Sequence, residues 1–203
     1  MLTSVEIFVL TLLFSLPLGL FVAFGRMSRN TIVKNVTKVY ISILRGTPLI
    51  LQLMLVYFGP YYIFGVRTPK GYRFLATIIG FVLNYAAYFA EIYRAGIESM
   101  PVGQYEAARV LGYNKTQTFI KIILPQVIKR ILPPVTNEVI TLIKDTSLAF
   151  VISVGEMFTA AKAIASAQRS TLPFVAAGIF YYVFNFIVAV AMEWLEKKFS
   201  YFQ

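Results

Sequence analysis

The sequence predicts an all-α integral membrane protein, because its composition and its long uncharged stretches both suit a lipid environment. Of its 203 residues, 58% are hydrophobic and the mean hydropathy is +0.71, whereas a soluble domain is usually about 45–50% apolar. Several stretches approach the roughly 20 apolar residues that span a hydrocarbon core. Since helices satisfy their own backbone hydrogen bonds in lipid, we expect about five transmembrane helices in one domain covering residues 1–203.

Each expected transmembrane helix is an apolar stretch bounded by charged or turn-forming residues. The five stretches are residues 7–25, 46–66, 74–90, 131–155 and 171–192. A helix of nineteen residues covers roughly 28 Å at about 1.5 Å per residue. The first stretch exceeds the apolar core of a signal peptide, which is about 7–15 residues long and follows a basic segment, so we expect it to stay as a helix.

Shorter helices are expected between the spans. Residues 26–40 are polar and basic and predict a short surface helix, and Pro48 disfavours helix at the residue before it. Residues 151–170, rich in Ala and Ser, predict a short helix outside the membrane. Pro125 is expected to close the long basic linker of about residues 94–130 before the fourth span begins.

The basic residues predict the orientation in the membrane. Most of the 19 Lys and Arg residues fall in the linker after the first span, in the linker after the third span and in the C-terminal tail. The positive-inside rule places these segments in the cytoplasm. With five crossings, the N-terminus is then external and the C-terminus cytoplasmic.

Composition excludes several kinds of chemistry. The chain has no Cys and no His, so thiolate and imidazole metal sites and an ordinary imidazole base are excluded. It has no Gly-rich phosphate loop followed by Lys and Ser or Thr, so ATP is not bound by that route. We expect no catalytic residue, no metal and no cofactor bound by this chain. The net charge of +10 is spread over separate segments without a nucleic-acid reader motif, so nucleic acid is not an expected partner.

The linker of residues 94–130 contains a predicted short helix, residues 102–111, that ends at Gly112, a residue typical of helix C-termini. Tyr105, Ala108 and either Leu111 or Gly112 recur at a spacing of three to four residues. Such a face fits a groove on a partner protein, where Ala107 and Ala108 permit close approach and Glu106 offers a charge. The alternative is an amphipathic helix on the membrane surface.

The pattern that begins at Glu106 resembles a known signature. Glu106-Ala107-Ala108 is followed by three residues, Gly112, nine residues, Ile122, one residue and Leu124-Pro125. This resembles the cytoplasmic "EAA" loop of ATP-binding-cassette (ABC) importer permeases. Three further strings resemble the polar amino-acid branch of that family, which takes up histidine, arginine and glutamine: they begin at Arg45 (RGTPL), Glu91 (EIYRAGIE) and Lys144 (KDTSL).

The resemblance implies a permease subunit in a prokaryotic inner or plasma membrane. The helix carrying Glu106 to Gly112 would couple to two ABC ATPase subunits, and ATP and Mg would bind there. It also implies a second permease subunit, expected to be an identical copy, and an extracytoplasmic solute-binding protein that delivers an amino acid. Translocation into the cytoplasm would follow by alternating access.

Charges inside the fourth span predict a solute path. Glu138 and Asp145 are seven residues apart, so their side chains are about 20° apart around a helix. Ionisable groups in spans usually line a cavity or a solute path, and carboxylates attract an ammonium or guanidinium group. The alternative is a structural role. Lys144 diverges from Asp145 by about 100° and would need a partner on another helix such as Glu91, which we expect to be an ion-pair residue near the cytoplasmic end.

Other candidates for the solute path lie in the second and third spans. Gln52 and Asn84 suit either solute contact or helix packing, and packing is the commoner role. Met54 and Tyr61 belong to a face of the second span, with Tyr57 or Phe58, that suits cation–π contact. The same face suits simple packing or anchoring at the membrane interface.

Two other classes of protein fit some of these observations. A self-contained secondary transporter or channel could use Glu138, Lys144 and Asp145 as ion or proton sites. A membrane-anchored protein could bind nucleic acid through its basic loops. Co-purification with an ATPase, and transport that requires ATP rather than an ion gradient, would separate an ABC importer from the first class.

Overall fold

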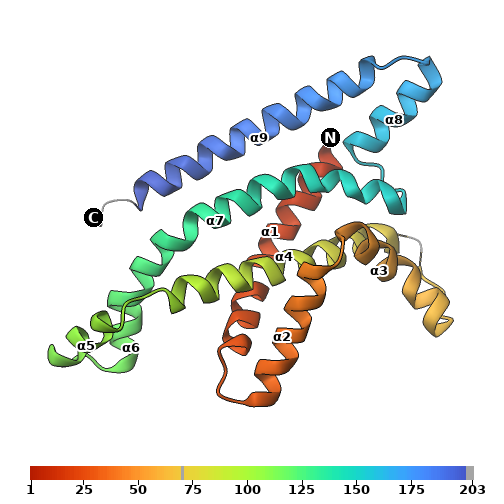
Figure 1. Cartoon of the computed structure of the whole chain (residues 1–203). Coiled ribbons are helices and arrows are strands. Elements are labelled where there is room, and N and C mark those ends of the chain that lie inside the picture. Colours follow the sequence, from red (N-terminus) through yellow and green to blue (C-terminus); the bar gives the residue numbers. More distant parts are fainter. Residues whose placement is uncertain (70, 200–203) are drawn as a thin grey trace.

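The structure is a computed structural model that describes residues 1–69 and 71–199, and within this part it is helical with no strand. Figure 1 shows the arrangement of the helices. The elements are α1 (Leu2–Arg26), α2 (Thr31–Gly46), α3 (Leu49–Phe64), α4 (Tyr72–Glu98), α5 (Val102–Val110), α6 (Lys115–Thr118), the π-helix η1 (Phe119–Ile123), α7 (Leu124–Asp145), the 3-10 helix η2 (Thr146–Ile152), α8 (Met157–Gln168) and α9 (Leu172–Lys198). The predicted all-α class is confirmed.

Three helices, α1, α4 and α9, are each long and apolar enough to cross a membrane. Two bent pairs raise the number of candidate spans to five. The first pair is α2 with α3, which meet at 110°, and the second is the segment from Lys115 to Ile152 with α8, which meet at 58°. The expected count of about five spans therefore agrees with the upper end of this range.

The second span, predicted over residues 46–66, is longer than the helix observed there, α3. The surface helix expected over residues 26–40 begins at Thr31 and continues to Gly46, and Asn30 caps it by accepting hydrogen bonds from two backbone N–H groups. The chain then turns at the extended residues Thr47 and Pro48, and α3 runs for only 16 residues. Pro48 makes this turn because it disfavours helical backbone at Thr47.

The expectation that Pro125 closes the linker is wrong. Pro125 lies in the first turn of α7, directly after the π-helix η1. The π-helix η1 leads directly into α7, so the chain stays helical from Lys115 to Ile152. The fourth span, expected over residues 131–155, also changes character at its end, because α7 ends at Asp145 and η2 follows.

The core lies where α1 crosses α4. Small buried residues of α1, including Ser15, Gly19 and Ala23, let the two backbones approach closely. Around this crossing, large side chains such as Phe81 and Leu142 are fully buried. Small residues are typical of helix contacts in membranes, because close packing replaces the hydrophobic effect there.

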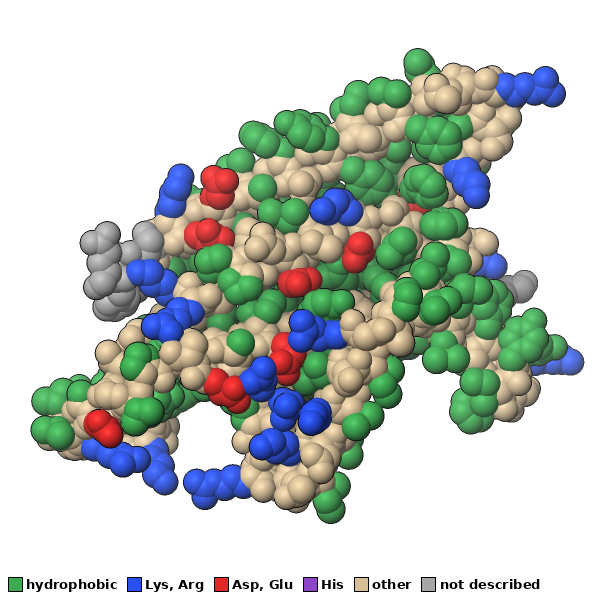
Figure 2. Space-filling view, in the orientation of Figure 1, with side chains coloured by type: hydrophobic (Ala, Val, Ile, Leu, Met, Phe, Trp, Pro, Cys, Tyr) green, Lys and Arg blue, Asp and Glu red, His purple; other side chains and the backbone are tan. Residues whose placement is uncertain are grey.

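The outer faces of α1 and α9 are apolar and exposed. Side chains such as Phe21 on α1 and Phe186 on α9 are 73% and 60% exposed, and Figure 2 shows hydrophobic side chains along α9. An exposed apolar face of this length suits lipid or another membrane helix.

The two ends of the molecule carry different elements. The backbone N–H of Met157, the first residue of α8, donates to Ser4 Oγ at 3.1 Å, so α8 begins beside the N-terminus. Helices α5 and α6 lie at the opposite end, together with the C-terminal end of α9 (Figure 1). The short helix predicted within residues 151–170 is confirmed as α8.

Candidate functional site

The loop that resembles the EAA signature forms a compact unit beyond the end of α4. Met100 and Pro101 separate α4 from α5. Gly112 has a φ of +79°, a conformation that glycine adopts without steric cost. The N–H groups of Gly112 and Tyr113 donate to the carbonyls of Arg109 and Ala108, each at 3.0 Å. Gly112 therefore ends α5 in the manner that the sequence predicts.

The structure divides the predicted docking face of α5 into an inner and an outer part. Ala108 is 1% exposed, and Tyr105 is half-buried against Met100 and Ile123. Tyr105 packs α5 against the rest of the loop, and Ala108 leaves no surface for a partner. The exposed residues include Glu106, Ala107, Val110 and Leu111, the last two at 88% and 72%.

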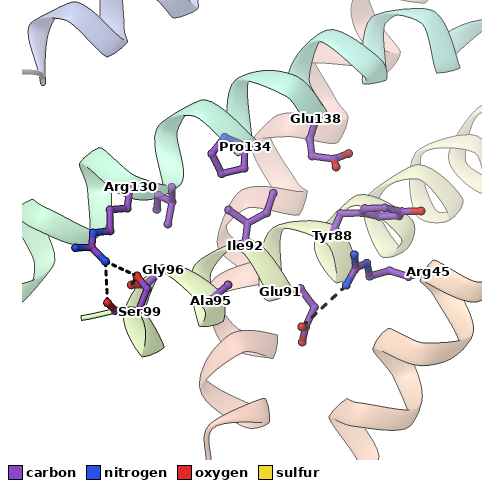
Figure 3. A pocket seen from close by; sticks show the side chains of 11 residues that line it. Arg45, Tyr88, Glu91, Ile92, Ala95, Gly96, Ser99, Arg130, Pro134 and Glu138 are labelled. Carbon is purple, nitrogen blue, oxygen red and sulfur yellow. Dashed lines mark hydrogen bonds and ion pairs between the residues drawn. The ribbon is translucent and has the colours of Figure 1, made fainter. Parts of the chain in front are cut away.

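A cavity of about 640 Å³ lies between α4 and α7. Figure 3 shows Glu138 from α7, Tyr88 and Glu91 from α4, and Arg45 from the end of α2 around it. At the opposite end of the cavity, Arg130 Nη1 donates to the carbonyl oxygen of Ser99 at 2.7 Å and to its Oγ at 3.1 Å. Both signs of charge thus line one cavity.

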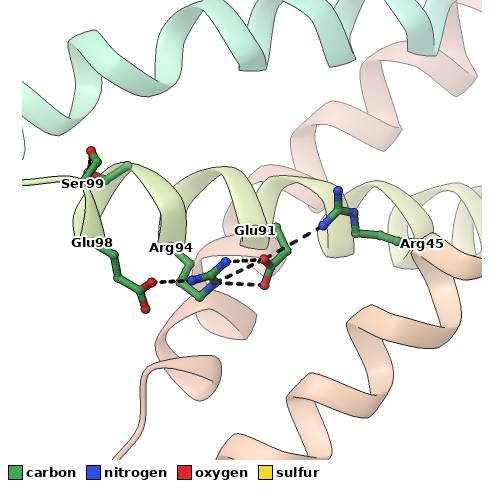
Figure 4. Close-up of polar contacts among 6 residues, drawn as sticks. Arg45, Glu91, Arg94, Glu98 and Ser99 are labelled. Atoms are coloured by element: carbon green, nitrogen blue, oxygen red, sulfur yellow. Dashed lines mark hydrogen bonds and ion pairs between the residues drawn. The ribbon is translucent and has the colours of Figure 1, made fainter.

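Glu91 is at the centre of a chain of ion pairs on α4 (Figure 4). Arg94 Nη2 lies 2.6 Å from Glu91 Oε2, and Arg45 Nη1 lies 4.0 Å from the same oxygen. Arg94 also pairs with Glu98. Glu91 is therefore an ion-pair residue, as predicted, but its partners are arginines and not Lys144, whose side chain is exposed.

The two intramembrane carboxylates have different surroundings. Glu138 is half-buried and lines the cavity. Asp145 is half-buried and accepts a hydrogen bond from the hydroxyl of Tyr85 on α4, with an oxygen–oxygen distance of 2.7 Å. Asp145 is therefore tied to α4, whereas Glu138 faces the open space.

Gln52 and Asn84 form a hydrogen-bonded network at the turn between α2 and α3. Asn84 Nδ2 donates to Gln52 Oε1 at 2.9 Å and to the carbonyl of Leu44 at 3.1 Å. Gln52 Nε2 donates to the Leu44 carbonyl at 2.9 Å and to the carbonyl of Thr47 at 3.0 Å. Both amides are at least nine-tenths buried, and their contacts are those of the packing role.

The remaining predicted residues lie on α3, away from the cavity. Met54 and Tyr61 are 38% and 55% exposed, and neither lines the space between α4 and α7. Tyr61 is instead in edge contact with Tyr62, with ring centroids 5.2 Å apart.

Sequence reasoning missed several residues around the cavity. Tyr88, Ile92, Ala95 and Ser99 line it from one face of α4, and their spacing of three to four residues was a readable signal. Arg45 was recognised only as the first residue of the RGTPL string, and no role was predicted for its side chain. Tyr85, the partner of Asp145, is sixty residues away in the chain, and no local pattern connects the two.

Comparison with known proteins agrees with this geometry. Residues 15–201 match the family described as "Binding-protein-dependent transport system inner membrane component". The L-cystine transport system permease protein TcyL of Bacillus subtilis (strain 168) is 42% identical, over 96% of this chain and 81% of the relative. The octopine transport system permease protein OccM of Rhizobium radiobacter is 39% identical, over 90% and 79% respectively.

Solved structures are similar over nearly the whole chain. One described as an amino acid ABC transporter with histidines has a TM-score of 0.87 and 33% identity, covering 98% of this chain and 91% of that one. The MetNI methionine ABC transporter in an inward-facing conformation has a TM-score of 0.70 at 16% identity, which supports the fold alone.

A bundle of apolar helices, a cavity lined by charges of both signs and a loop that resembles the EAA signature together define a membrane-embedded transport subunit. The chain belongs to the binding-protein-dependent transport system inner membrane component family. It is a multi-pass inner-membrane permease rather than an enzyme, and the ATPase of such a transporter is a separate subunit. This membership does not support a self-contained channel or secondary transporter.

Proposed function

We propose that this permease subunit of an amino-acid ABC importer carries a basic or polar amino acid, namely arginine, lysine, histidine or glutamine, into the cytoplasm by alternating access. The observation that carries the proposal is the cavity between α4 and α7, which Glu138 and Arg45 line together. Relatives named for cystine, octopine and glutamine transport support an amino-acid solute of varying side chain.

A zwitterion needs one anionic and one cationic contact, and this cavity offers both. Glu138 is in none of the ion pairs among the described residues, so its carboxylate is available to an ammonium or guanidinium group. Arg45 makes only a 4.0 Å contact with Glu91 and lies over the Tyr88 ring at 5.2 Å, so its guanidinium is available to a carboxylate. Charge-assisted hydrogen bonds of this kind are the strong ones.

The orientation and the partners complete the proposal. The N-terminus and α8 lie outside the cell, and α5, α6 and the C-terminal end of α9 lie in the cytoplasm, because the basic residues gather there. Two ABC ATPase subunits, which bind ATP and Mg, contact the exposed side of α5 that carries Glu106, Ala107 and Leu111. A second copy of this chain and an extracytoplasmic solute-binding protein complete the importer.

Replacing Glu138 with alanine is expected to weaken uptake of arginine and lysine more than uptake of glutamine. Loss of a hydrogen bond to a charged group costs about 1.5–3 kcal/mol, which corresponds to a rise in KM of roughly tenfold to hundredfold. Asp145→Ala is expected to act in the same direction and also to release Tyr85. The measurement is uptake kinetics of radiolabelled amino acids into proteoliposomes that contain the permease–ATPase complex.

The matched control is Glu6→Ala, which removes the same charge from an exposed position on α1. Unchanged kinetics in both the Glu138 and the Asp145 variant, or an equal effect in the Glu6 variant, would contradict the assignment of Glu138 and Asp145. A thermal-stabilisation screen of the purified complex against the twenty amino acids tests the solute class directly. Stabilisation by none of the basic or polar amino acids named above would contradict the proposed solute.

A further inference from the structure

A second, strongly basic pocket lies where α1 and α2 meet, outside the cavity described above. Its volume is about 690 Å³. Four cationic side chains line it, together with one carboxylate: Arg26, Lys34, Lys38, Arg94 and Glu98. Figure 2 shows Lys and Arg side chains gathered over the end of the molecule where α1 and α2 are joined.

Three of these cations make no close ion pair with a carboxylate among the described residues. Glu98 pairs with Arg94, which also pairs with Glu91. Within residues 1–69 and 71–199, the side-chain nitrogens of Arg26, Lys34 and Lys38 make no ion pair within 4.0 Å. Like charges held around one concave surface repel each other unless an anion lies between them.

The pocket has rigid walls. The hydroxyl of Tyr40 on α2 donates to the carbonyl of Leu83 on α4 at 2.6 Å. Ala23, Ile41 and Ala87 form one buried cluster that joins α1, α2 and α4. The three helices are therefore held against one another, which fixes the backbone positions from which the cationic side chains extend.

The opposite face of α2 is apolar. Ile32, Val36, Val39 and Ile43 recur at three- or four-residue spacing and are 73%, 63%, 56% and 55% exposed. Lys34 and Lys38 lie about 170° and about 130° away from the centre of this face around the helix. A helix with an apolar face and a basic face lies at the boundary between acyl chains and headgroups, and the last turn of the span α1 ends at Arg26.

We propose that this pocket binds a phosphate-bearing anion, and that its position at the membrane boundary selects the headgroup of an anionic phospholipid of the cytoplasmic leaflet. The choice of leaflet rests on the orientation given under the proposed function. The cytoplasmic surface of the bilayer is negative, and basic pockets between helices on that side bind phospholipid headgroups. The headgroup phosphate lies among Arg26, Lys34 and Lys38, and α2 places its apolar stripe against the acyl chains.

The test is retention of phosphatidylglycerol by the purified permease–ATPase complex, measured by native mass spectrometry after delipidation and titration with phosphatidylglycerol or phosphatidylcholine. The variant is Lys34→Gln with Lys38→Gln. The control is Lys115→Gln with Lys121→Gln, which removes the same charge from exposed positions of α6 and η1. From the usual contribution of a lysine near a charged surface, the pocket variant should bind phosphatidylglycerol about thirtyfold more weakly, and the control should match the unmodified complex.

Three outcomes decide the matter. Loss confined to the pocket variant, with no competition by inorganic phosphate, supports a lipid headgroup. Loss confined to the pocket variant with full competition by millimolar inorganic phosphate supports the same phosphate site but a soluble ligand. Equal retention in all complexes, equal loss in both variants, or no preference over phosphatidylcholine overturns the proposal. The lipid-binding experiment contains no amino acid, so a negative result in it does not bear on the proposed amino-acid solute.

Discussion

Replacing Gly112 with valine is expected to abolish ATP-driven uptake while leaving the protein inserted in the membrane. Gly112 has a φ of +79°, and a β-branched residue there costs about 1–3 kcal/mol of backbone strain. A Cβ atom at this position would meet nothing within 4 Å, so the effect acts through the backbone. The turn that orients Val110 and Leu111 then rearranges, and the ATPase loses the surface it contacts under our proposal.

The measurement is amino-acid uptake by the complex in proteoliposomes, beside ATPase activity and the amount of permease in the membrane. Uptake should fall at least tenfold, while membrane insertion stays unchanged. Gly112→Asn is the conservative variant, since Asn tolerates the left-handed conformation, and it should keep most of the activity. Gly103→Val, at an exposed position on α5 where a Cβ also meets nothing, should behave like the unmodified protein. Full uptake by the Gly112→Val variant would contradict a role of Gly112 in coupling.

Replacing Gly19 with valine is expected to destabilise the whole bundle. A Cβ atom at Gly19 would lie 2.9 Å from the Cβ of Phe89, 3.1 Å from the carbonyl oxygen of Ala86 and 3.3 Å from the backbone nitrogen of Ala90. Two of these three atoms are backbone, so the contact cannot be relieved by turning a side chain. Overpacking of this kind costs about 1–3 kcal/mol or more, and here it separates α1 from α4.

The measurement is thermal unfolding in detergent, with the loss of the monodisperse peak as the readout. Gly178→Val on α9 is the matched control, because a Cβ there meets nothing within 4 Å and the change in helix propensity is the same. The midpoint should fall by several degrees for Gly19→Val and little for Gly178→Val. Equal midpoints for the two variants would show that α1 and α4 can pack further apart than they do in the structure without loss of stability.

Much of the fold was predictable because its signals are local. Apolar stretches indicated the long helices α1, α4 and α9, and Pro48 indicated the turn before α3. Gly112 was predictable as the end of α5 because glycine is the usual residue in the left-handed position just after a helix.

The rest depends on which faces meet, and the sequence carries no local record of that. Tyr85 meets Asp145 only because α4 packs on α7. Ala108 was expected on a docking surface but is buried, and Tyr105 of the same face packs against Met100 and against Ile123 of η1. Pro125 was misassigned because proline occurs both just after the end of a helix and in the first turn of a helix.

The uninterrupted helical segment from Lys115 to Ile152 has a mechanical consequence. It begins in the loop and carries Glu138, about 35 Å further along at roughly 1.5 Å per residue. Because the segment is continuously helical, a push on α6 is transmitted along it towards the carboxylate, and Pro133 and Pro134 inside α7 are positions where the helix bends. The π-turn of η1, a geometry frequent at functional sites, is the joint at which such a lever would pivot.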